Sequence, residues 1–185
     1  MTTERFWGGP DSLKLCFVLD CSVPIKKIDG WSEKGINPDV EAISGNNAGM
    51  VLDFGELEGS EVLFKIALSY TTVDNAIENL NTELPHWDFE KIRKDTRDIW
   101  NEMFGRIAVE GGSQAQHIKF YTDLWHALLG RHKITDVNGY YPDYTAGPYV
   151  NKRTAAPMKI RRVPMDKTGK PTFNMYGFDL SLIHI

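Results

Sequence analysis

Apolar residues alternate with polar ones through the first third of the chain, and after Thr72 they recur at intervals of three and four. Alternation is typical of a strand that buries one face, and three-four spacing is typical of an amphipathic helix. The pattern therefore predicts a β region that is followed by helices from about Val73.

Three segments of the β region have the pattern of strands: residues 13–19, 50–54 and 61–70. The last segment places five apolar side chains on one face, which are Val62, Phe64, Ile66, Leu68 and Tyr70. In the first segment the corresponding face is formed by Leu13, Leu15, Phe17 and Leu19. A few strands with one apolar face cannot close a sandwich, because each sheet needs a partner that covers it. We therefore expect the remaining strands to lie upstream.

Two helices are predicted directly after the β region. The first has Thr72 as its N-cap and stops before Pro85, and its apolar stripe consists of Ala76, Ile77, Leu80 and Leu84. The second has Asp88 as its N-cap and extends to about Gly105. Its stripe contains aromatic residues that we expect to be buried, and it consists of Ile92, Thr96, Ile99, Trp100, Met103, Phe104 and Ile107.

A third helix is predicted from the capping-box pattern of Ser113 and Gln116. Gly130 is placed to end it, and its stripe consists of Ile118, Tyr121, Trp125, Leu128 and Leu129. Residues 131–172 have no such periodicity, and their Gly, Pro, Asn and Tyr content predicts loops with a hairpin among them.

Composition and charge exclude several classes of function. The chain is 42% hydrophobic and 25% charged, as in ordinary globular proteins, and its net charge of -4 without a basic stripe excludes nucleic acid as a partner. No apolar run approaches the roughly 18 residues that cross a bilayer, and residues 1–5 are too polar for a signal peptide. Cys16 and Cys21 are either a disulfide at a strand corner or two small packed thiols.

Residues 136–144 are the most site-like segment of the sequence. We take Asp136, Tyr140 and Tyr141 as candidates for sugar binding, because polar groups around a glycine turn are followed by tyrosines that can stack on a ring. The alternative is a structural Asx turn packed by aromatic residues. The segment lacks the twelve-residue spacing of an EF-hand, and we assign no catalytic residue and no metal ligand in the chain.

Other residues that can carry chemistry have a plainer interpretation. His126 and His132 are expected to be structural or solvated. Trp31, near Lys27 and Asp29, is either a loop aromatic that touches a ligand or a residue that covers the strand layer, and we assign it no role. The sequence contains no nucleophile elbow, no phosphate-binding glycine loop and no cysteine or histidine cluster with zinc spacing.

Five segments taken together resemble glycoside hydrolase family 92. They are Thr72 to Leu80, Trp87 to Phe89, Trp100-Asn101, Gly105 to Gly111 and Phe120 to His126. With Asp136-Val-Asn-Gly-Tyr140 following in the same order, the resemblance covers about residues 13–179. It implies an α+β chain in which residues 1–72 end an N-terminal β-sandwich domain, residues 73–112 form two linker helices, and residues 113–179 begin an (α/α)6 catalytic barrel.

The resemblance also implies an activity. Members of the family are glycoside hydrolases that remove terminal α-linked mannose from glycans by an inverting, calcium-assisted mechanism, and we expect α-1,2 linkages as the substrate. The general acid, the general base and the calcium ligands lie further along the barrel, so none is carried onto a residue of this chain. We therefore expect the chain alone to be inactive, with mannose-containing glycans as partners of the parent enzyme in the periplasm or outside the cell.

Residues 180–185 depart from the family pattern that Met175 to Asp179 continues. We interpret them as a non-native tail, which makes the chain a truncated fragment. The apolar stripes of its helices would then lack partners, and this predicts poor solubility or association.

Two other functions are compatible with the residues. The first is a carbohydrate-binding or structural module without catalysis, which would use the loop tyrosines and Trp31. The second is another carbohydrate enzyme with a related (α/α)6 layout, such as a phosphorylase. The segments at residues 87–89 and 105–111 favour the mannosidase.

Overall fold

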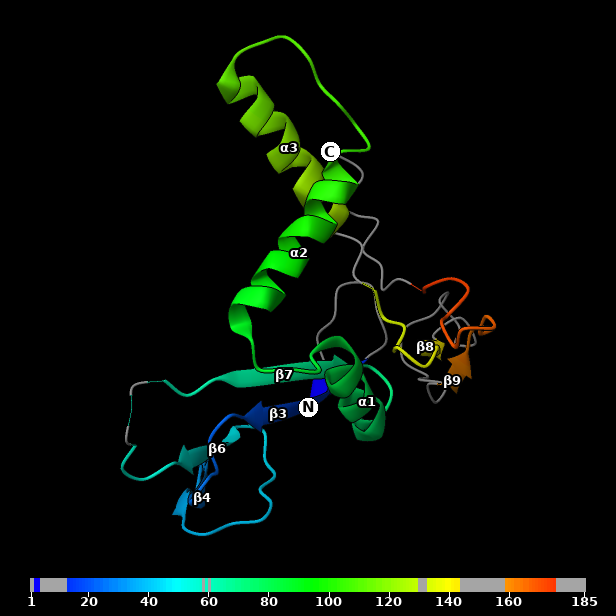
Figure 1. The fold of residues 1–185 in the computed structure, drawn as a ribbon. Coiled ribbons are helices and arrows are strands. Elements are labelled where there is room, and N and C mark those ends of the chain that lie inside the picture. The colour runs from blue at the N-terminus through cyan, green and yellow to red at the C-terminus, as the bar shows by residue number, and fades with distance from the viewer. Residues whose placement is uncertain are drawn as a thin grey trace. The chain divides into compact units, whose positions relative to one another are not determined.

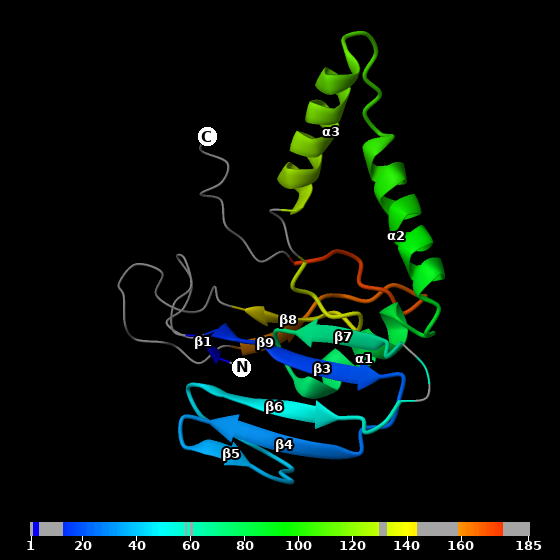
Figure 2. The same ribbon diagram turned by 90° about the vertical axis from the view of Figure 1, so that its left-hand side faces the viewer.

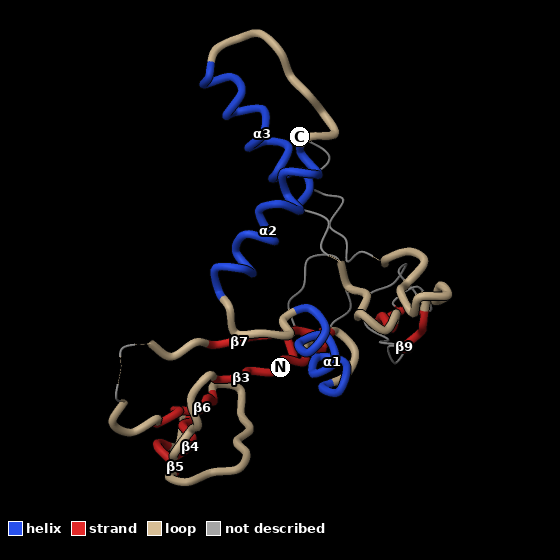
Figure 3. The backbone as a smooth tube through the Cα atoms, in the orientation of Figure 1, coloured by secondary structure: helices blue, strands red, loops and turns tan. Residues whose placement is uncertain are grey.

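A computed structural model of the chain describes residues 2–3, 13–57, 59, 61–129, 133–143 and 159–175. The described residues form three helices and several antiparallel strand pairs, so the fold is a mixture of α and β structure (Figures 1 and 3). The chain divides into two compact units. One is Leu19–Ile66, and the other is formed by the residues on both sides of it.

The unit of residues 19–66 contains a three-stranded antiparallel sheet. Its strands are β4 (Lys27–Ser32), β5 (Gly35–Asn37) and β6 (Ala48–Asp53), in the order β5-β4-β6 (Figure 2). The predicted strand at residues 50–54 corresponds to β6. Strand β4 was not predicted, because charged residues and a glycine interrupt its apolar alternation.

Strand β3 (Cys16–Cys21) pairs with β7 (Phe64–Ser69), and β1 (Thr2–Thr3) pairs with β2 (Leu13–Lys14). The alternation predicted for β7 is present, but the expected burial of its apolar face is wrong. Ala67 and Ser69 are the buried residues of β7, whereas Phe64, Ile66 and Leu68 are 51%, 58% and 48% exposed. Phe64 contacts the ring of Phe54 edge to face, at a centroid distance of 6.0 Å.

In β3, too, the predicted apolar face is exposed, and the buried residue lies on the opposite face. Cys16 is buried, whereas Phe17 and Leu19 of the predicted apolar face are exposed. Both cysteines are free thiols, so the interpretation as small packed residues is confirmed for Cys16. Burial, followed by the charge of Asp20, raises the pKa of the Cys21 thiol.

Helix α1 (Val73–Glu83) begins and ends where the sequence predicts. The Thr72 hydroxyl oxygen accepts a hydrogen bond from the Asn75 amide at 3.1 Å, which satisfies one of the unpaired amides of the first turn. Ala76 and Leu80 of the predicted stripe are buried, whereas Ile77 is 42% exposed.

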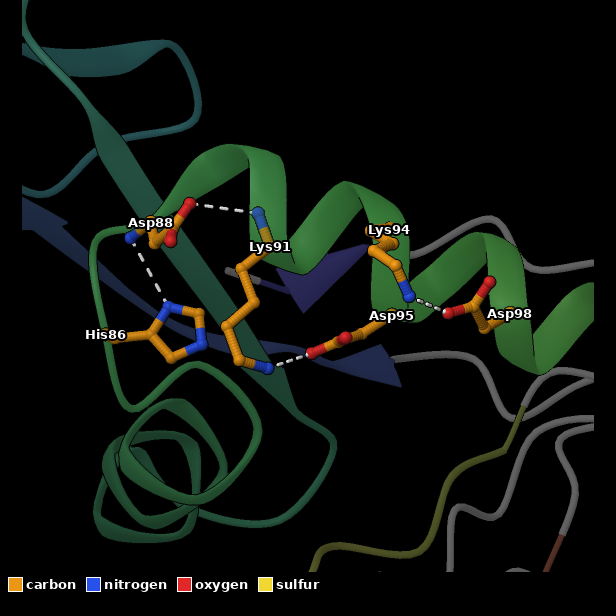
Figure 4. Close-up of polar contacts among 6 residues, drawn as sticks. All are labelled: His86, Asp88, Lys91, Lys94, Asp95 and Asp98. Carbon is orange, nitrogen blue, oxygen red and sulfur yellow. Dashed lines mark hydrogen bonds and ion pairs between the residues drawn. The ribbon is translucent and has the colours of Figure 1, made fainter.

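Helix α2 (Phe89–Phe104) is capped by Asp88, whose carboxylate accepts from the Lys91 amide at 2.9 Å (Figure 4). Its polar side carries ion pairs one turn apart, among them Lys91–Asp95 and Lys94–Asp98. The expected burial of its aromatic residues is wrong, because α2 contains no buried residue and Ile99 is 61% exposed. Helix α2 is therefore amphipathic, but most of its apolar face is not packed against other described residues.

Helix α3 (Gln114–Leu129) begins with the predicted capping box. The Ser113 amide donates to Gln116 Oε1 at 2.7 Å, and the Gln116 amide donates to Ser113 Oγ at 3.4 Å. Helices α2 and α3 meet near the loop that joins them, where the Tyr121 hydroxyl donates to the Ile107 carbonyl at 3.0 Å. The predicted end at Gly130 lies outside the described residues.

Strand β8 (Tyr140–Asp143) pairs antiparallel with β9 (Lys159–Arg162), and this confirms strand pairing in the loop-rich region. A bridge between Met165 and Pro171 closes a short turn after β9. None of the described helices combines the length and the apolar character that are needed to cross a bilayer.

Candidate functional site

The carboxylate of Asp136 is the centre of a buried polar cluster. Its Oδ2 accepts hydrogen bonds from the Ser69 hydroxyl at 2.9 Å and the Thr71 hydroxyl at 2.6 Å, and its Oδ1 accepts from Asn79 Nδ2 at 2.7 Å. Asp136 itself is only 3% exposed. We call Asp136, Ser69, Thr71 and Asn79 the Asp136 cluster. A buried carboxylate needs such donors, because an unpaired charge in the interior is strongly unfavourable.

Secondary structure positions the three donors. Ser69 ends β7, Thr71 precedes the N-cap of α1, and Asn79 lies on the buried face of α1. Asn79 also donates to the Leu68 carbonyl at 2.9 Å and accepts from the Val137 amide at 2.9 Å. One amide side chain therefore joins the strand, the helix and the residue that follows Asp136.

A tight turn holds the backbone of Asp136. Its amide donates to the Tyr140 carbonyl at 2.8 Å, and its carbonyl accepts from the Gly139 amide at 2.9 Å. Gly139 has a φ of +87°, and a Cβ atom there would lie 2.6 Å from the sulfur of Met165. This turn therefore requires glycine both for its backbone conformation and for space.

Asn138 attaches the same turn to the outer side of α1. Its Nδ2 donates to Asn75 Oδ1 at 2.9 Å and to Glu78 Oε2 at 2.6 Å. Its carbonyl accepts from Arg162 Nε at 2.8 Å, and the Arg162 guanidinium lies 5.2 Å from the ring centroid of Tyr140. Tyr140 is thus packed beneath a cation of the neighbouring strand.

The three sequence candidates consequently have different surroundings. Asp136 is buried and accepts from three side chains, whereas Tyr140 and Tyr141 are half-buried in β8. The geometry around Asp136 matches the structural turn that we considered as the alternative. Sugar binding by Asp136, Tyr140 and Tyr141 stays a prediction, and Tyr144 lies outside the described residues.

Sequence reasoning missed the three donors of the cluster. Ser69 and Thr71 are small polar residues at the end of a strand, and nothing in the sequence pattern distinguishes them from ordinary exposed residues. The position of Asn79 could have been recognised from the sequence. It lies three residues after Ala76 and next to Leu80, so helical spacing places it on the buried face of α1. A polar residue at a core position of a helix requires a buried partner.

The second buried carboxylate, that of Asp143, forms an ion pair with the guanidinium of Arg161 on β9. Among the residues that the structure describes, no group of three or more acidic, histidine or cysteine side chains is arranged to hold a metal ion. The oxygens of Asp136 are already occupied by donors, so these residues do not fit a calcium site.

Helices α2 and α3 carry an open apolar groove of about 590 Å³, lined by Phe104, His117, Ile118, Tyr121, Thr122 and Trp125. Ile118 is 60% exposed. His126 is exposed beside the Trp125 ring, at a centroid distance of 4.9 Å, which agrees with a solvated residue. His132 lies outside the described residues.

Comparison with solved structures identifies the fold. The chain matches the family GH92 inverting mannosidase of Bacteroides thetaiotaomicron VPI-5482 with a TM-score of 0.73 and 20% identity, over 93% of this chain and 21% of that structure. It matches a gh92 family glycosyl hydrolase with a TM-score of 0.68 and 24% identity, over 74% of this chain and 18% of that structure. The chain therefore has a fold that occurs in glycosyl hydrolases.

Comparison of the sequence finds similarity to one glycosidase family. Residues 75–162 match the model of the glycosyl hydrolase family 92 catalytic domain. A curated relative, an uncharacterized secreted glycosidase of Arthroderma benhamiae, is 28% identical over 83 residues, which are 43% of this chain and 11% of that protein. Residues 75–162 are thus similar to a segment of that catalytic domain, and the chain spans about a tenth to a fifth of the length of these relatives.

Proposed function

We propose that this chain is part of a glycosidase that removes terminal α-linked mannose from glycans, with α-1,2 linkages as the substrate. The observation that carries the proposal is the match of residues 75–162 to the family 92 catalytic domain. The fold of an inverting mannosidase over 93% of the chain supports it. The end of a β-sandwich, two linker helices and the start of an (α/α)6 barrel are the domain arrangement that we propose for it.

Inversion requires two carboxyl groups on opposite sides of the scissile bond. One protonates the leaving oxygen, and the other activates a water molecule, for which the two groups must be about 6.5–9.5 Å apart. The buried carboxylates of the described residues, Asp136 and Asp143, are both bound by donors of the chain itself. Because each carboxylate already has donors within the chain, we assign neither a catalytic role.

Calcium belongs to the same proposal, with ligands outside the described residues. When bound, the ion would hold the terminal sugar and help to distort its ring. The secreted relative supports a location outside the cell or in the periplasm for the whole enzyme. Mannose-containing glycans are the proposed partners.

The proposal is tested by comparing this chain with a longer product of the same gene that includes the residues downstream of Asp179. Both are incubated with α-1,2-mannobiose, with calcium and with a chelator, and released mannose is followed by proton NMR. We expect no release by this chain and calcium-dependent release of β-mannose first by the longer product. Release of α-mannose first would contradict inversion, and no release by a folded longer product would contradict the proposed activity.

A further inference from the structure

One face of the sheet in the unit of residues 19–66 combines an aromatic ring with charges. Trp31 of β4 pairs with Gly49 of β6, Asp29 pairs with Val51, and Lys27 pairs with Asp53. Paired residues of antiparallel strands project to the same side of a sheet, and every second residue of a strand shares that side. Ile36 of β5 also pairs with Trp31 and shares this side. We call Lys27, Asp29, Trp31, Ile36, Gly49, Val51 and Asp53 the Trp31 face.

The indole of Trp31 lies directly over the backbone of Gly49. A Cβ atom at Gly49 would be 2.5 Å from the indole Nε1, 2.6 Å from Cε2 and 2.8 Å from Cζ2. These similar distances to three consecutive atoms of the indole show that the ring covers the glycine. Trp31 nevertheless remains 38% exposed. The glycine thus lets an aromatic ring lie on the sheet and present a surface to solvent.

Charged groups lie beside this ring and are held in place. Lys27 Nζ and Asp29 Oδ2 are 2.9 Å apart, and Asp29 Oδ1 accepts from the Asp39 amide at 2.9 Å. The hydrogen bonds from Lys27 and from the Asp39 amide lower the pKa of Asp29. The pair therefore offers a fixed carboxylate and an ammonium group at one edge of the aromatic surface.

The opposite face of the same sheet is different. Gly30 on that side is buried, and its missing Cβ would lie 2.9 Å from side-chain atoms of both Val40 and Ile43. Around Gly30, that face is covered by apolar side chains of its own unit. A face that packs in the core of a sandwich is expected to be apolar along its inward positions. Lys27, Asp29 and Asp53 break this pattern, so the Trp31 face is suited to a polar ligand.

We propose that the Trp31 face binds a pyranose ring of a glycan, with the apolar C–H side of the sugar on the indole and its hydroxyl groups on Asp29 and Lys27. Stacking removes apolar surface of both partners from water. Hydroxyl groups form their stronger hydrogen bonds with charged partners such as these. A single sugar on one open surface buries little area, so we expect a dissociation constant of about 1 mM or weaker. This binding is independent of the proposed hydrolysis.

Saturation-transfer NMR on the full 185-residue chain tests the proposal, with methyl α-mannopyranoside and α-1,2-mannobiose as probes. This measurement observes the sugar, so it does not require a concentrated protein. We expect saturation of the ring C–H protons and saturable binding. Trp31→Ala should weaken binding by at least about tenfold, while Trp125→Ala, which removes an exposed indole of α3, should leave it unchanged.

A second variant separates the position of the ring from its presence. Gly49→Ala keeps Trp31 but displaces the indole, so it should also weaken binding by about tenfold. Circular dichroism that matches the unchanged chain shows that both variants are folded. Absence of saturation transfer, or transfer that Trp31→Ala and Gly49→Ala leave intact, would overturn the proposal. So would concentration-dependent association that Trp31→Ala abolishes, because a second copy would then occupy the face.

Discussion

The Asp136 cluster and the helix pair α2–α3 use polar contacts in opposite ways. In the cluster, residues 57 to 67 positions apart in sequence meet in a buried site. In the helix pair, the ion pairs join residues three or four positions apart on an exposed surface. The first kind of contact fixes tertiary structure, whereas the second supports a helix that its own sequence already specifies.

The energetic consequences differ for the same reason. Removing one partner from a buried cluster leaves the others without water or a partner, and this costs about 1–3 kcal/mol for each unsatisfied group. Exposed ion pairs lose little, because water replaces the missing partner. The comparison predicts that substitutions of similar chemistry will have very different effects in the two regions.

Asp136→Ala should have the largest effect on stability. It leaves the Ser69 and Thr71 hydroxyls and the Asn79 amide without their acceptor, and we expect a loss of about 3 kcal/mol. The measurement is urea unfolding, with hydrogen exchange of α1 to locate the loss. Asp123→Ala on α3, whose carboxylate pairs with Lys119 on the surface, is the matched control. Equal effects of the two variants would contradict the comparison.

Asn79→Ala should come next, at about 2 kcal/mol, because it removes a donor to Asp136 and the acceptor of the Val137 amide. Asn81→Ala is the control, since it makes the same change at an exposed position of the same helix. Chemical unfolding of both variants measures the difference. If Asn81→Ala destabilised the chain as much as Asn79→Ala, helix propensity rather than the cluster would explain the loss.

Ile118→Glu tests the apolar side of the helix pair. The exposed stripe of α3 predicts association of the chain, and a charge in the groove should weaken association by about tenfold. Sedimentation velocity over a range of concentrations measures this change. Lys119→Glu places the same residue on the polar side of α3 and should not reduce association. If the unsubstituted chain is monomeric at all concentrations, the groove does not mediate association.

Lys94→Ala should have the smallest effect. The hydrogen bond to Asp98 raises the pKa of Lys94, so this contribution is present at neutral pH and is lost only as the pH rises above the usual lysine range. The hydrogen bond from Lys91 lowers the pKa of Asp95, so that contribution is present at neutral pH and is lost as the pH falls below the usual aspartate range.

Helix content of the Lys94→Ala variant, measured by circular dichroism at low and high salt, checks this expectation. A small loss of helix at low salt should disappear at high salt, because salt screens exposed charges. A loss that persists at high salt would show that Lys94 contributes through packing instead.

Local structure was predicted best where neighbours in sequence provide the contacts. The N-caps at Thr72 and Asp88 and the capping box at Ser113 occur as predicted, because each uses partners within four residues. Strand β4 was missed because its Trp31 face carries charges and its other face contains Gly30. A strand of this kind cannot be recognised from apolar alternation unless it is known what covers each side of its sheet.

The sequence by itself determined the helices, the alternation of β7 and the similarity of residues 75–162 to a glycosyl hydrolase family 92 domain, since these depend on local spacing and on residue order. Only the tertiary structure decided that Asp136 is a buried hub and that the predicted apolar face of β7 is exposed. It also placed the Trp31 indole on Gly49 of the neighbouring strand. The physical reason is that burial and the choice of hydrogen-bond partner depend on residues that are distant in sequence, and periodicity records only which side a residue faces.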